Sequence, residues 1–415
     1  MIRLPRWLPL LVVIGLCTVP VASTGYAAMT PTTITFLTPP WGVPPDKPML
    51  DAFTKATGIT VQTISVPNAE VYSKAQVASA AGRAPADVIF LSEEAPSFIV
   101  APGYLEPLDA YIAKSPDLRP NDLERMDFWK RDGKQQGITT YVQLVMMDYN
   151  AKRAAAAGIS NPPARWDELV ADAKQIKAKG VDQYPISMGA IDWSWYLIAL
   201  SMGDPMFDAS LTPVFANAGS PSRAAMATFL GMFKDGLISP DLLTKVTPHD
   251  TFMAGVGVFH QSWQGAHAVM NNPKISKQAP DVRYMLLPDK HYTWSLDAAI
   301  GISKFSRNKD AAWQFITWYV SPDSQQAIFK AVGLVPSRVS VQQALNKAGA
   351  IQQYDLLVEQ SKYVHQLPRY ATWWGPWTQF VTEEIRRATQ GSEGADAAID
   401  SIAKKWSELK AQYKK

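Results

Sequence analysis

The stretch Thr33-Ile34-Thr35-Phe36-Leu37 begins an alternation of element types that decides the fold. It has the β-branched and aromatic residues of a strand, and a helical pattern follows from Met49 to Ala56. A second strand is predicted at 59–64, and a third at 87–91 after another helical pattern through 71–81. Strands that alternate with helices predict an α/β fold in which helices cover an open sheet.

Aromatic and polar residues follow two of these strands. Trp41 comes shortly after the first strand, and Ser92, Glu93 and Glu94 come directly after the third. Ligands of open α/β sheets bind beyond the carboxyl ends of the strands. We therefore expect these residues to lie on one wall of a binding cleft.

A second α/β region begins near Gly137. The long run from Ile138 to Met147 has the composition of a strand, and two helices follow it. The first ends at Gly158 and the second at Gly180, since glycine suits the position after a helix. The predicted elements here are helices 152–157, 166–179 and 222–233, a strand at 256–260, and a helical tail from 380 to 410 that is interrupted near 391–394.

Tryptophan is abundant in segments that have the composition of loops or strand ends. An indole there exposes a flat apolar face and one N–H donor, which suits a sugar ring, an aromatic ligand or a cationic head group. Core packing is an equally good interpretation of any single one, but we expect at least three of them in a binding cleft. The chain has 14 Trp, and the eight in such segments are Trp41, Trp193, Trp195, Trp263, Trp294, Trp373, Trp374 and Trp377. Four others recur on apolar helix faces and are predicted to be structural: Trp166, Trp313, Trp318 and Trp406.

The N-terminus is typical of a secretory signal peptide. Arg3 and Arg6 precede an apolar run that is too short and too interrupted for a confident membrane span, and small residues follow it. We expect residues 1–27 to be the signal peptide, with cleavage after Ala27 or Ala28, and the protein to be periplasmic. Cys17 is the only Cys in the chain, and Leu16 before it disfavours a lipid anchor. The exported protein would then contain no disulfide.

Composition limits the possible functions. A length of 415 residues is enough for about two or three domains, and a hydrophobic content of 47% supports well-built cores. Arg3 and Arg6 account for two of the net +3, so the chain without them is near +1 and no nucleic-acid partner is implied. The five histidines lack metal-ligand spacing, and no phosphate loop or Gly-x-Ser-x-Gly motif occurs. We predict no metal, no cofactor and no catalytic residue.

Three groups of motifs are informative together: Tyr149-Asn150 with Ala157-Gly158-Ile159, Pro162-Pro163 and Trp166-Asp167-Glu168-Leu169; 252–258 with Trp263; and 299–303 with 309–316, Ser324-Gln325 and Gly333-Leu334-Val335-Pro336. Together they resemble the family 1 extracellular solute-binding proteins of bacterial ABC importers, the group that includes maltose-binding protein. The resemblance covers nearly the whole chain after the signal peptide. Two departures are Val256-Gly257-Val258-Phe259, where many members have Ala-Ala-Met after a glycine, and the missing lipidation site.

The resemblance implies the two-lobed periplasmic binding protein fold of type II, in which strands cross between discontinuous lobes. By analogy, the first lobe contains 29–138 plus 284–333, and the second contains 139–283 plus 334–415. The crossings would fall at 139–141, 284–288 and 334–336. Each of these stretches is extended and rich in Pro or β-branched residues, so closure there would be a hinge motion.

The resemblance also implies capture of a solute for a separate permease in the inner membrane, without covalent chemistry, by a chain that we expect to be a monomer. A pyranose has apolar C–H faces and a ring of hydroxyls, so a sugar site needs aromatic rings, carboxylates and amides. We favour a carbohydrate, with a di- or oligosaccharide suggested by the many aromatic rings. The candidate ligand-binding residues are Trp41, Glu93, Glu94, Trp294 and Asp297 on the first lobe, and Tyr141, Trp193, Trp195, Trp263, Trp373 and Trp374 on the second.

Two alternatives stay open. The same fold could bind a quaternary ammonium or polyamine cation, since aromatic cages with carboxylates capture such groups. A secreted glycoside hydrolase would need two carboxylates that flank the scissile bond. Glu93 and Glu94 are adjacent and would point apart on a strand, so the sequence argues little for an enzyme.

Overall fold

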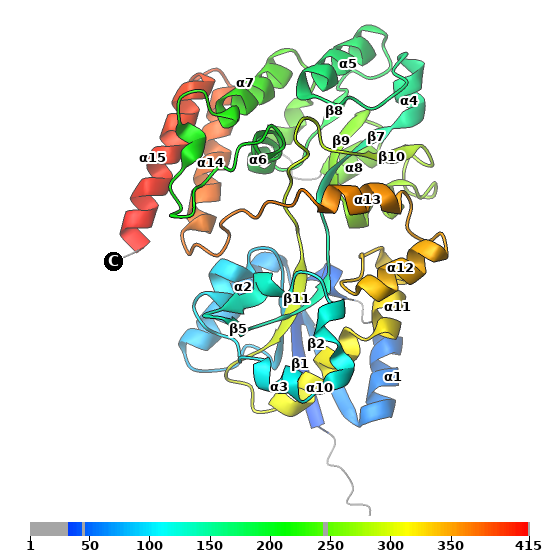
Figure 1. Cartoon of the computed structure of the whole chain (residues 1–415), viewed down its shortest axis with the longest axis vertical. Coiled ribbons are helices and arrows are strands. Elements are labelled where there is room, and N and C mark those ends of the chain that lie inside the picture. The colour runs from blue at the N-terminus through cyan, green and yellow to red at the C-terminus, as the bar shows by residue number, and fades with distance from the viewer. Residues whose placement is uncertain (1–31, 44–45, 244–247, 414–415) are drawn as a thin grey trace, which may run out of the picture.

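The computed structural model describes residues 32–43, 46–243 and 248–413. These residues form two lobes, one below the other in Figure 1, and each lobe has its own sheet. The N-terminal strand lies in the lower lobe and the C-terminal helix in the upper lobe. The predicted signal peptide, 1–27, and residues 29–31 of the predicted first lobe lie outside the described residues.

The first lobe is built on a five-stranded sheet with the order β2-β1-β3-β11-β6. β1 is parallel to β2 and β3, whereas β11 is antiparallel to β3 and β6. The strands are β1 Thr32–Thr38, β2 Ile59–Ser65, β3 Val88–Leu91, β6 Ile138–Tyr141 and β11 Ala298–Ile302, and the hairpin strands β4 Lys130–Arg131 and β5 Lys134–Gln135 lie beside them. The helices are α1 Lys47–Thr57, α2 Asn68–Ala80, α3 Asp109–Ala113, α10 Lys309–Tyr319 and α11 Pro322–Val332.

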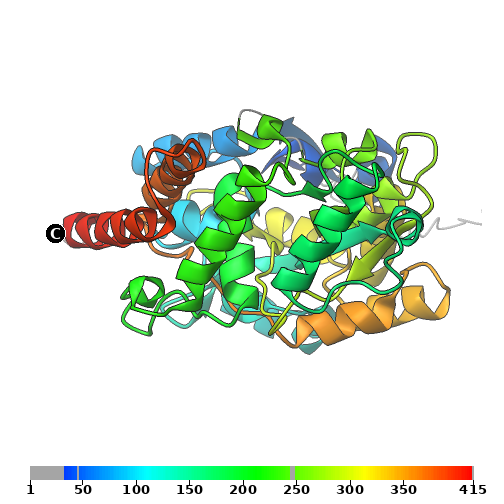
Figure 2. The same ribbon diagram turned by 90° about the horizontal axis from the view of Figure 1, so that it is seen from above.

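The second lobe is built on a four-stranded sheet with the order β10-β7-β9-β8. Its strands are β7 Val145–Asn150, β8 Ile186–Ser187, β9 Phe259–Trp263 and β10 Val282–Met285. Its helices are α4 Ala151–Ala156, α5 Trp166–Ala178, α6 Ile191–Ser201, α7 Pro221–Lys234, α8 Pro248–Met253, α9 His267–Met270, α12 Val339–Lys347, α13 Tyr354–Ser361, α14 Trp374–Thr389 and α15 Ala395–Tyr413. Seen from above, α14 and α15 lie side by side at one end of this lobe, away from α13 (Figure 2).

The predicted order of strands and helices is confirmed, because local residues set these elements. Asp46 begins α1 by accepting a hydrogen bond from the Met49 backbone N–H at 3.1 Å, and Gly58 ends it with a φ of 73°. Gly158 and Gly180 follow α4 and α5 with φ values of 81° and 68°, as the sequence predicted. The break near 391–394 separates α14 from α15.

The predicted strand from Ile138 to Met147 is two strands. β6 belongs to the first sheet and β7 to the second, so the chain crosses between lobes at 142–144. The predicted crossing at 139–141 is therefore three residues too early. These residues still belong to β6, in which Thr139 and Tyr141 pair with β11. The third crossing, 334–336, runs beside the first, since Tyr141 bridges Pro336 and the Val142 N–H donates to Val335 O at 3.0 Å.

The second predicted crossing, 284–288, is also misplaced. All of β10, from Val282 to Met285, pairs with β7 in the second sheet, and Trp294 packs in the core of that lobe. The chain crosses just before β11, where Ser295 bridges Leu144. From this pairing we propose that the lobes divide at 142–144, 294–297 and 334–338. The boundary at 283/284 was wrong because an apolar strand has the same composition in either lobe.

The aromatic core of the second lobe explains most of the tryptophans. Tyr196 stacks on Trp377 with ring centroids 5.8 Å apart, and Phe207 lies 4.2 Å from Trp406. Trp166 and Trp406 are buried and Trp313 nearly so, while Trp318 is half-buried against the first core, which confirms these four as structural. The prediction that all eight other tryptophans lie in loops or at strand ends is wrong for the four that lie in helices α6 and α14: Trp193, Trp195, Trp374 and Trp377.

Candidate ligand-binding site

A cavity of about 280 Å³ lies where the crossing strands join the two lobes. Its wall contains four aromatic side chains, one carboxylate and one amide, and the rest is aliphatic. The lining residues are Trp41, Glu93, Tyr141, Gln143, Trp193, Trp263, Leu296 and Leu334. Five of these were predicted from the sequence as ligand-binding residues: Trp41, Glu93, Tyr141, Trp193 and Trp263.

The first lobe contributes Trp41 and Glu93 from the carboxyl ends of β1 and β3, as open α/β sheets predict. Trp41 is 42% exposed in a one-turn helix, Pro40–Gly42. A Cβ on Gly42 would lie 2.0 Å from Thr38 Oγ1 and 2.9 Å from the Phe90 ring. Only glycine lets this turn pack so closely on the sheet, and the packing directs Trp41 over the cavity.

The crossing strands contribute side chains by alternation. Tyr141 and Gln143 line the cavity, while Val142 and Leu144 line a separate hollow of about 410 Å³ behind the strands. This division follows because successive side chains of an extended chain point to opposite faces.

Alternation also decides the role of Asp297, whose neighbour Leu296 lines the cavity. The Asp297 side chain is buried, accepts hydrogen bonds from Ser295 Oγ at 2.7 Å and Gln143 N at 3.3 Å, and lies 3.6 Å from Arg125 Nε. Burial raises the pKa of Asp297 to about 6, although Arg125 lowers it. Leu296, and not Asp297, lines the cavity, so the role of Asp297 as a ligand residue stays a prediction.

The second lobe contributes Trp193 from the first turn of α6 and Trp263 from the end of β9. Trp193 meets the edge of buried Trp294 at 5.8 Å and 89°. The His249 ring packs against Trp263 with centroids 3.9 Å apart. Both indoles are therefore held by neighbours on one side and face the cavity on another.

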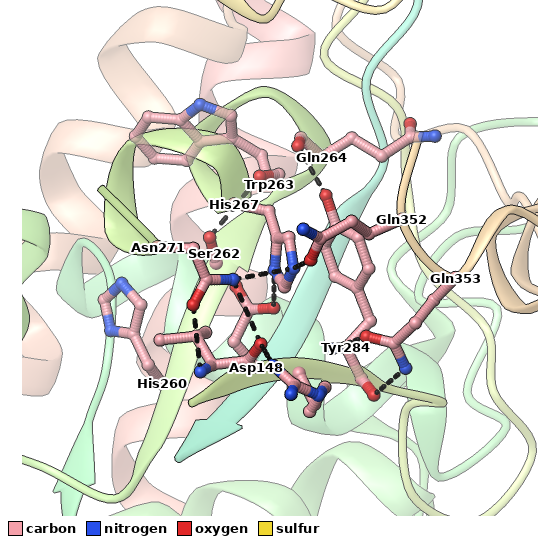
Figure 3. Close-up of polar contacts among 12 residues, drawn as sticks. Asp148, His260, Ser262, Trp263, Gln264, His267, Asn271, Tyr284, Gln352 and Gln353 are labelled. Atoms are coloured by element: carbon pink, nitrogen blue, oxygen red, sulfur yellow. Dashed lines mark hydrogen bonds and ion pairs between the residues drawn. The ribbon is translucent and has the colours of Figure 1, made fainter. Parts of the chain in front are cut away.

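A buried polar network supports the strand that ends at Trp263 (Figure 3). His267 Nδ1 lies 3.2 Å from Asp148 Oδ1, and the His267 ring stacks on Tyr284 at 3.9 Å. The Tyr284 hydroxyl donates to Gln264 O at 2.6 Å. Gln353 completes the open edge of β10, because its side chain accepts from Tyr284 N at 2.7 Å and donates to Tyr284 O at 3.2 Å. This network positions the backbone on either side of Trp263.

Carboxylates outnumber cations near the cavity. No described residue forms a hydrogen bond or an ion pair with the half-buried Glu93 side chain that lines it. Partial desolvation by surrounding protein atoms, together with the negative charge of Glu93, raises the pKa of Glu94 to about 7, although solvent still reaches the Glu94 side chain. Glu94 does not line the cavity, so its role as a ligand residue stays a prediction. Burial likewise raises the pKa of Asp192, at the start of α6, to about 6.

Arg369 is the cation among these carboxylates, and the sequence predictions missed it. Its guanidinium carbon lies 6.0 Å from the Trp193 ring centroid and 5.9 Å from that of Trp294. The side chain is buried, and Nη1 has no hydrogen-bond partner among the described residues. Burial lowers the pKa of Arg369, while Glu93 and Glu94 act in the opposite direction. A buried N–H group that has no partner and lies beside the cavity can donate a hydrogen bond to a ligand oxygen.

Four predicted ligand-binding tryptophans are buried in the second lobe instead: Trp195, Trp294, Trp373 and Trp374. The Trp195 indole donates to Ser222 O at 3.2 Å, and the Trp373 and Trp374 rings lie 5.5 Å and 6.3 Å from Trp406. None of the four lines the cavity. Trp195 packs on Phe215 and Trp294 packs on Trp193 and Tyr196, so these contacts come from segments that are distant along the chain. The roles of the four as ligand residues stay predictions.

The sequence predictions missed three lining residues, Gln143, Leu296 and Leu334, and two of them had a usable indication. Gln143 lies two residues beyond Tyr141 on an extended segment, and Leu334 begins a predicted crossing. Arg369, which does not line the cavity but lies beside Trp193, had no such indication, since it lies in an irregular segment between α13 and α14. Among the described residues, no three His, Cys, Asp or Glu side chains gather as a metal ion would require. No helix in the described ranges has the length and apolarity of a membrane span.

Two lobes joined by crossing strands, with an aromatic cavity at the junction, define a periplasmic type of solute-binding protein. The family model of the bacterial extracellular solute-binding proteins matches residues 48–357, and the chain belongs to this family. The family relationship implies a binding component of an ABC importer that acts outside the cytoplasmic membrane, as the resemblance predicted.

Curated relatives are named as binding proteins. A probable amino-acid ABC transporter periplasmic-binding protein of Sinorhizobium fredii is 27% identical over 69% of this chain and 68% of its own length. The diacetylchitobiose binding protein of Streptomyces coelicolor is 27% identical over 52% of each chain. The relatives named are binding proteins and not enzymes.

Solved structures share the fold. An ABC substrate-binding protein of Listeria monocytogenes in complex with cycloalternan has a TM-score of 0.80 at 21% identity, covering 92% of this chain and 100% of that one. MalE3 of T. maritima with bound maltose has a TM-score of 0.79 at 21% identity, covering 91% and 100%. The predicted two-lobed α/β fold is confirmed by these matches.

Proposed function

We propose that this protein captures a carbohydrate, a di- or oligosaccharide, in the cavity between its lobes and delivers it to an inner-membrane ABC permease. The observation that supports a sugar most directly is the lining of the cavity. Trp41, Trp193 and Trp263 offer apolar ring faces, and Glu93 and Gln143 offer polar groups beside them. This pairing suits the C–H faces and hydroxyls of a pyranose.

The proposed mechanism is passive. An open form binds the solute, and the lobes close because the ligand has a higher affinity for the closed state. The lining residues come from both lobes and from the crossing strands, so one ligand can contact all three parts. We further propose a monomer, exported after removal of the leader 1–27.

A second candidate ligand is an organic cation, and one observation favours it. Glu93 has no ion-pair partner among the described residues and lies in a cavity with three indoles and Tyr141. Aromatic rings around an unpaired carboxylate are also a recognition site for quaternary ammonium groups. The names and titles of similar proteins include both sugars and an amino acid, so an experiment has to distinguish the ligand classes.

A thermal-shift screen of the chain from Ala28 onward tests the proposal. The panel contains mono-, di- and oligosaccharides and sugar alcohols, together with choline, betaine and polyamines. A ligand at a concentration of about 100 times its Kd should add about 2.7 kcal/mol to the free energy of unfolding. Stabilisation by sugars without product formation is the expected result.

Glu93→Gln separates the two ligand classes. The amide keeps the size of the side chain and can still bond to a hydroxyl, so sugar affinity should fall modestly. A cation would lose its counter-charge and bind far more weakly. Stabilisation by cations alone, abolished in this variant, would replace the sugar proposal, and turnover of a glycan would overturn passive binding.

A further inference from the structure

A second hollow, of about 340 Å³, lies at the lobe boundary beside the segment that connects α13 to α14. In Figure 1 this segment, coloured orange, passes between the two lobes. Pro96 and Phe128 line the hollow from the first lobe, and Asp208, Gln366 and Tyr370 line it from the second. A molecule bound there would contact both lobes, as one in the inner cavity does.

The hollow has the lining of a sugar site. Tyr370 is 57% exposed, which leaves a ring face open to solvent, and Phe128 is half-buried. Asp208 is held in place because its Oδ1 accepts from the backbone N–H groups of Ser210 at 2.9 Å and Thr212 at 2.8 Å. An open aromatic face beside a fixed carboxylate and an amide matches the chemistry of the inner cavity.

The hollow and the inner cavity lie close to each other. Gln366 of the hollow donates to Ser295 Oγ at 2.8 Å, and the next residue, Leu296, lines the cavity. Tyr370 lines the hollow, and the preceding Arg369 lies 6.0 Å from the Trp193 ring of the cavity. Ser295 and Arg369 line neither space, but each adjoins or contacts residues that line both.

The volumes of the cavity and the hollow suggest why an oligosaccharide would need both. The inner cavity, at about 280 Å³, is slightly smaller than the usual ligand pocket, whose volume is roughly 300–1,000 Å³. A chain of several sugar units exceeds it, whereas the hollow adds a comparable volume at the same lobe boundary.

We propose that this hollow is an outer glycan subsite, which binds the units of an oligosaccharide that the inner cavity does not hold and has Tyr370 as its stacking surface. The inference rests on the proposed function, because it assumes a carbohydrate in the inner cavity.

Calorimetric titration with maltodextrins and chitin oligosaccharides, from disaccharide to hexasaccharide, tests the subsite. Affinity should increase with length in the unchanged protein. Tyr370→Ala should weaken binding of the longest chain that binds by about tenfold, the loss expected for one aromatic contact, and change disaccharide affinity by less than about twofold. Tyr370→Phe should bind like the unchanged protein because it keeps the ring.

Tyr413→Ala is the matched control, since Tyr413 is also exposed, at 47%, but lies at the end of α15. Urea unfolding of each variant checks that it folds. Equal losses for disaccharide and hexasaccharide in Tyr370→Ala, or no loss for either, would overturn the subsite while leaving the proposed function intact. Failure of the unchanged protein to bind any glycan would overturn the proposed function, and the subsite with it.

Discussion

At the scale of the residue, one side-chain type has two separate roles. Trp263 lines the cavity and is held from behind by His249, whereas Trp377 is fully buried and stacks on Tyr196. The indole is suited to both because it combines a large apolar area with one donor. The Trp377 donor is satisfied inside the protein, since Nε1 donates to Ile402 O at 3.1 Å.

Truncation should separate these roles. Trp263→Ala should weaken ligand binding by about 1–3 kcal/mol through the lost ring contact. Trp377→Ala should lower the free energy of unfolding by about 3–5 kcal/mol and leave affinity nearly unchanged. Calorimetry and urea unfolding of both variants measure the two effects. Unchanged affinity in Trp263→Ala, with lowered stability, would place that ring in the core instead.

Asp297 should make stability depend on pH. Burial raises its pKa from 3.8 to about 6 in the folded state, so the folded protein keeps a proton that the unfolded chain has already lost. The free energy of unfolding should therefore fall as pH rises from about 4 to about 6, relative to Asp297→Asn. Urea unfolding of both proteins across this window gives the difference. A difference that is constant with pH would contradict the assignment.

At the scale of the element, the crossing segments decide which side chains reach the ligand. Tyr141 and Gln143 face the cavity because they are two residues apart on an extended chain. Gly333, which ends α11, introduces the third crossing with a φ of 75°. A Cβ there would lie 3.1 Å from Gly265 O, close to the strand end at Trp263. The geometry of the helix end thus helps to set the cavity wall.

Gly333→Ala should be destabilising for two reasons. The left-handed backbone costs about 1–2 kcal/mol with any Cβ, and the contact with Gly265 O adds to it. Gly349→Ala is the control, because its φ is 69° but a Cβ would meet no atom within 4 Å. Urea unfolding should show the larger loss for Gly333→Ala, and equal losses would mean that the Gly265 contact relaxes freely.

At the scale of the whole molecule, the lobes touch away from the crossing strands. A Cβ on Gly375, in the first turn of α14, would lie 2.8 Å from the Phe98 ring of the first lobe. The two residues come from different lobes, so a larger side chain at 375 would hold the lobes apart. Closure around a ligand requires them to approach.

Gly375→Val should therefore weaken ligand binding although residue 375 does not line the cavity. Gly231→Val in α7 is the control, since it places the same β-branched residue in a helix where a Cβ would meet no atom within 4 Å. Small-angle scattering should show that ligand contracts the control protein more than Gly375→Val. Equal contraction and equal affinity would exclude Phe98 and Gly375 as a closure contact.

The sequence by itself determined the elements and their order. Residues such as Asp46, Gly58 and Gly158 act within a few positions of the chain, so α1 and α4 could be predicted from local patterns. The same local reasoning placed Trp41 and Glu93 beyond the ends of β1 and β3, where they line the cavity. The order of the sequence motifs was enough to predict the family.

Only the tertiary structure decided which tryptophans are core and which line the cavity. Trp195 is buried against Phe215 and α7, and Trp373 is buried against Trp406 of α15, so both depend on segments that are distant along the chain. Arg369 likewise meets Trp193 only through folding. Burial is a sum of contacts between distant segments, whereas capping, turns and periodicity depend on neighbours, and that difference separates what could be predicted from what could not.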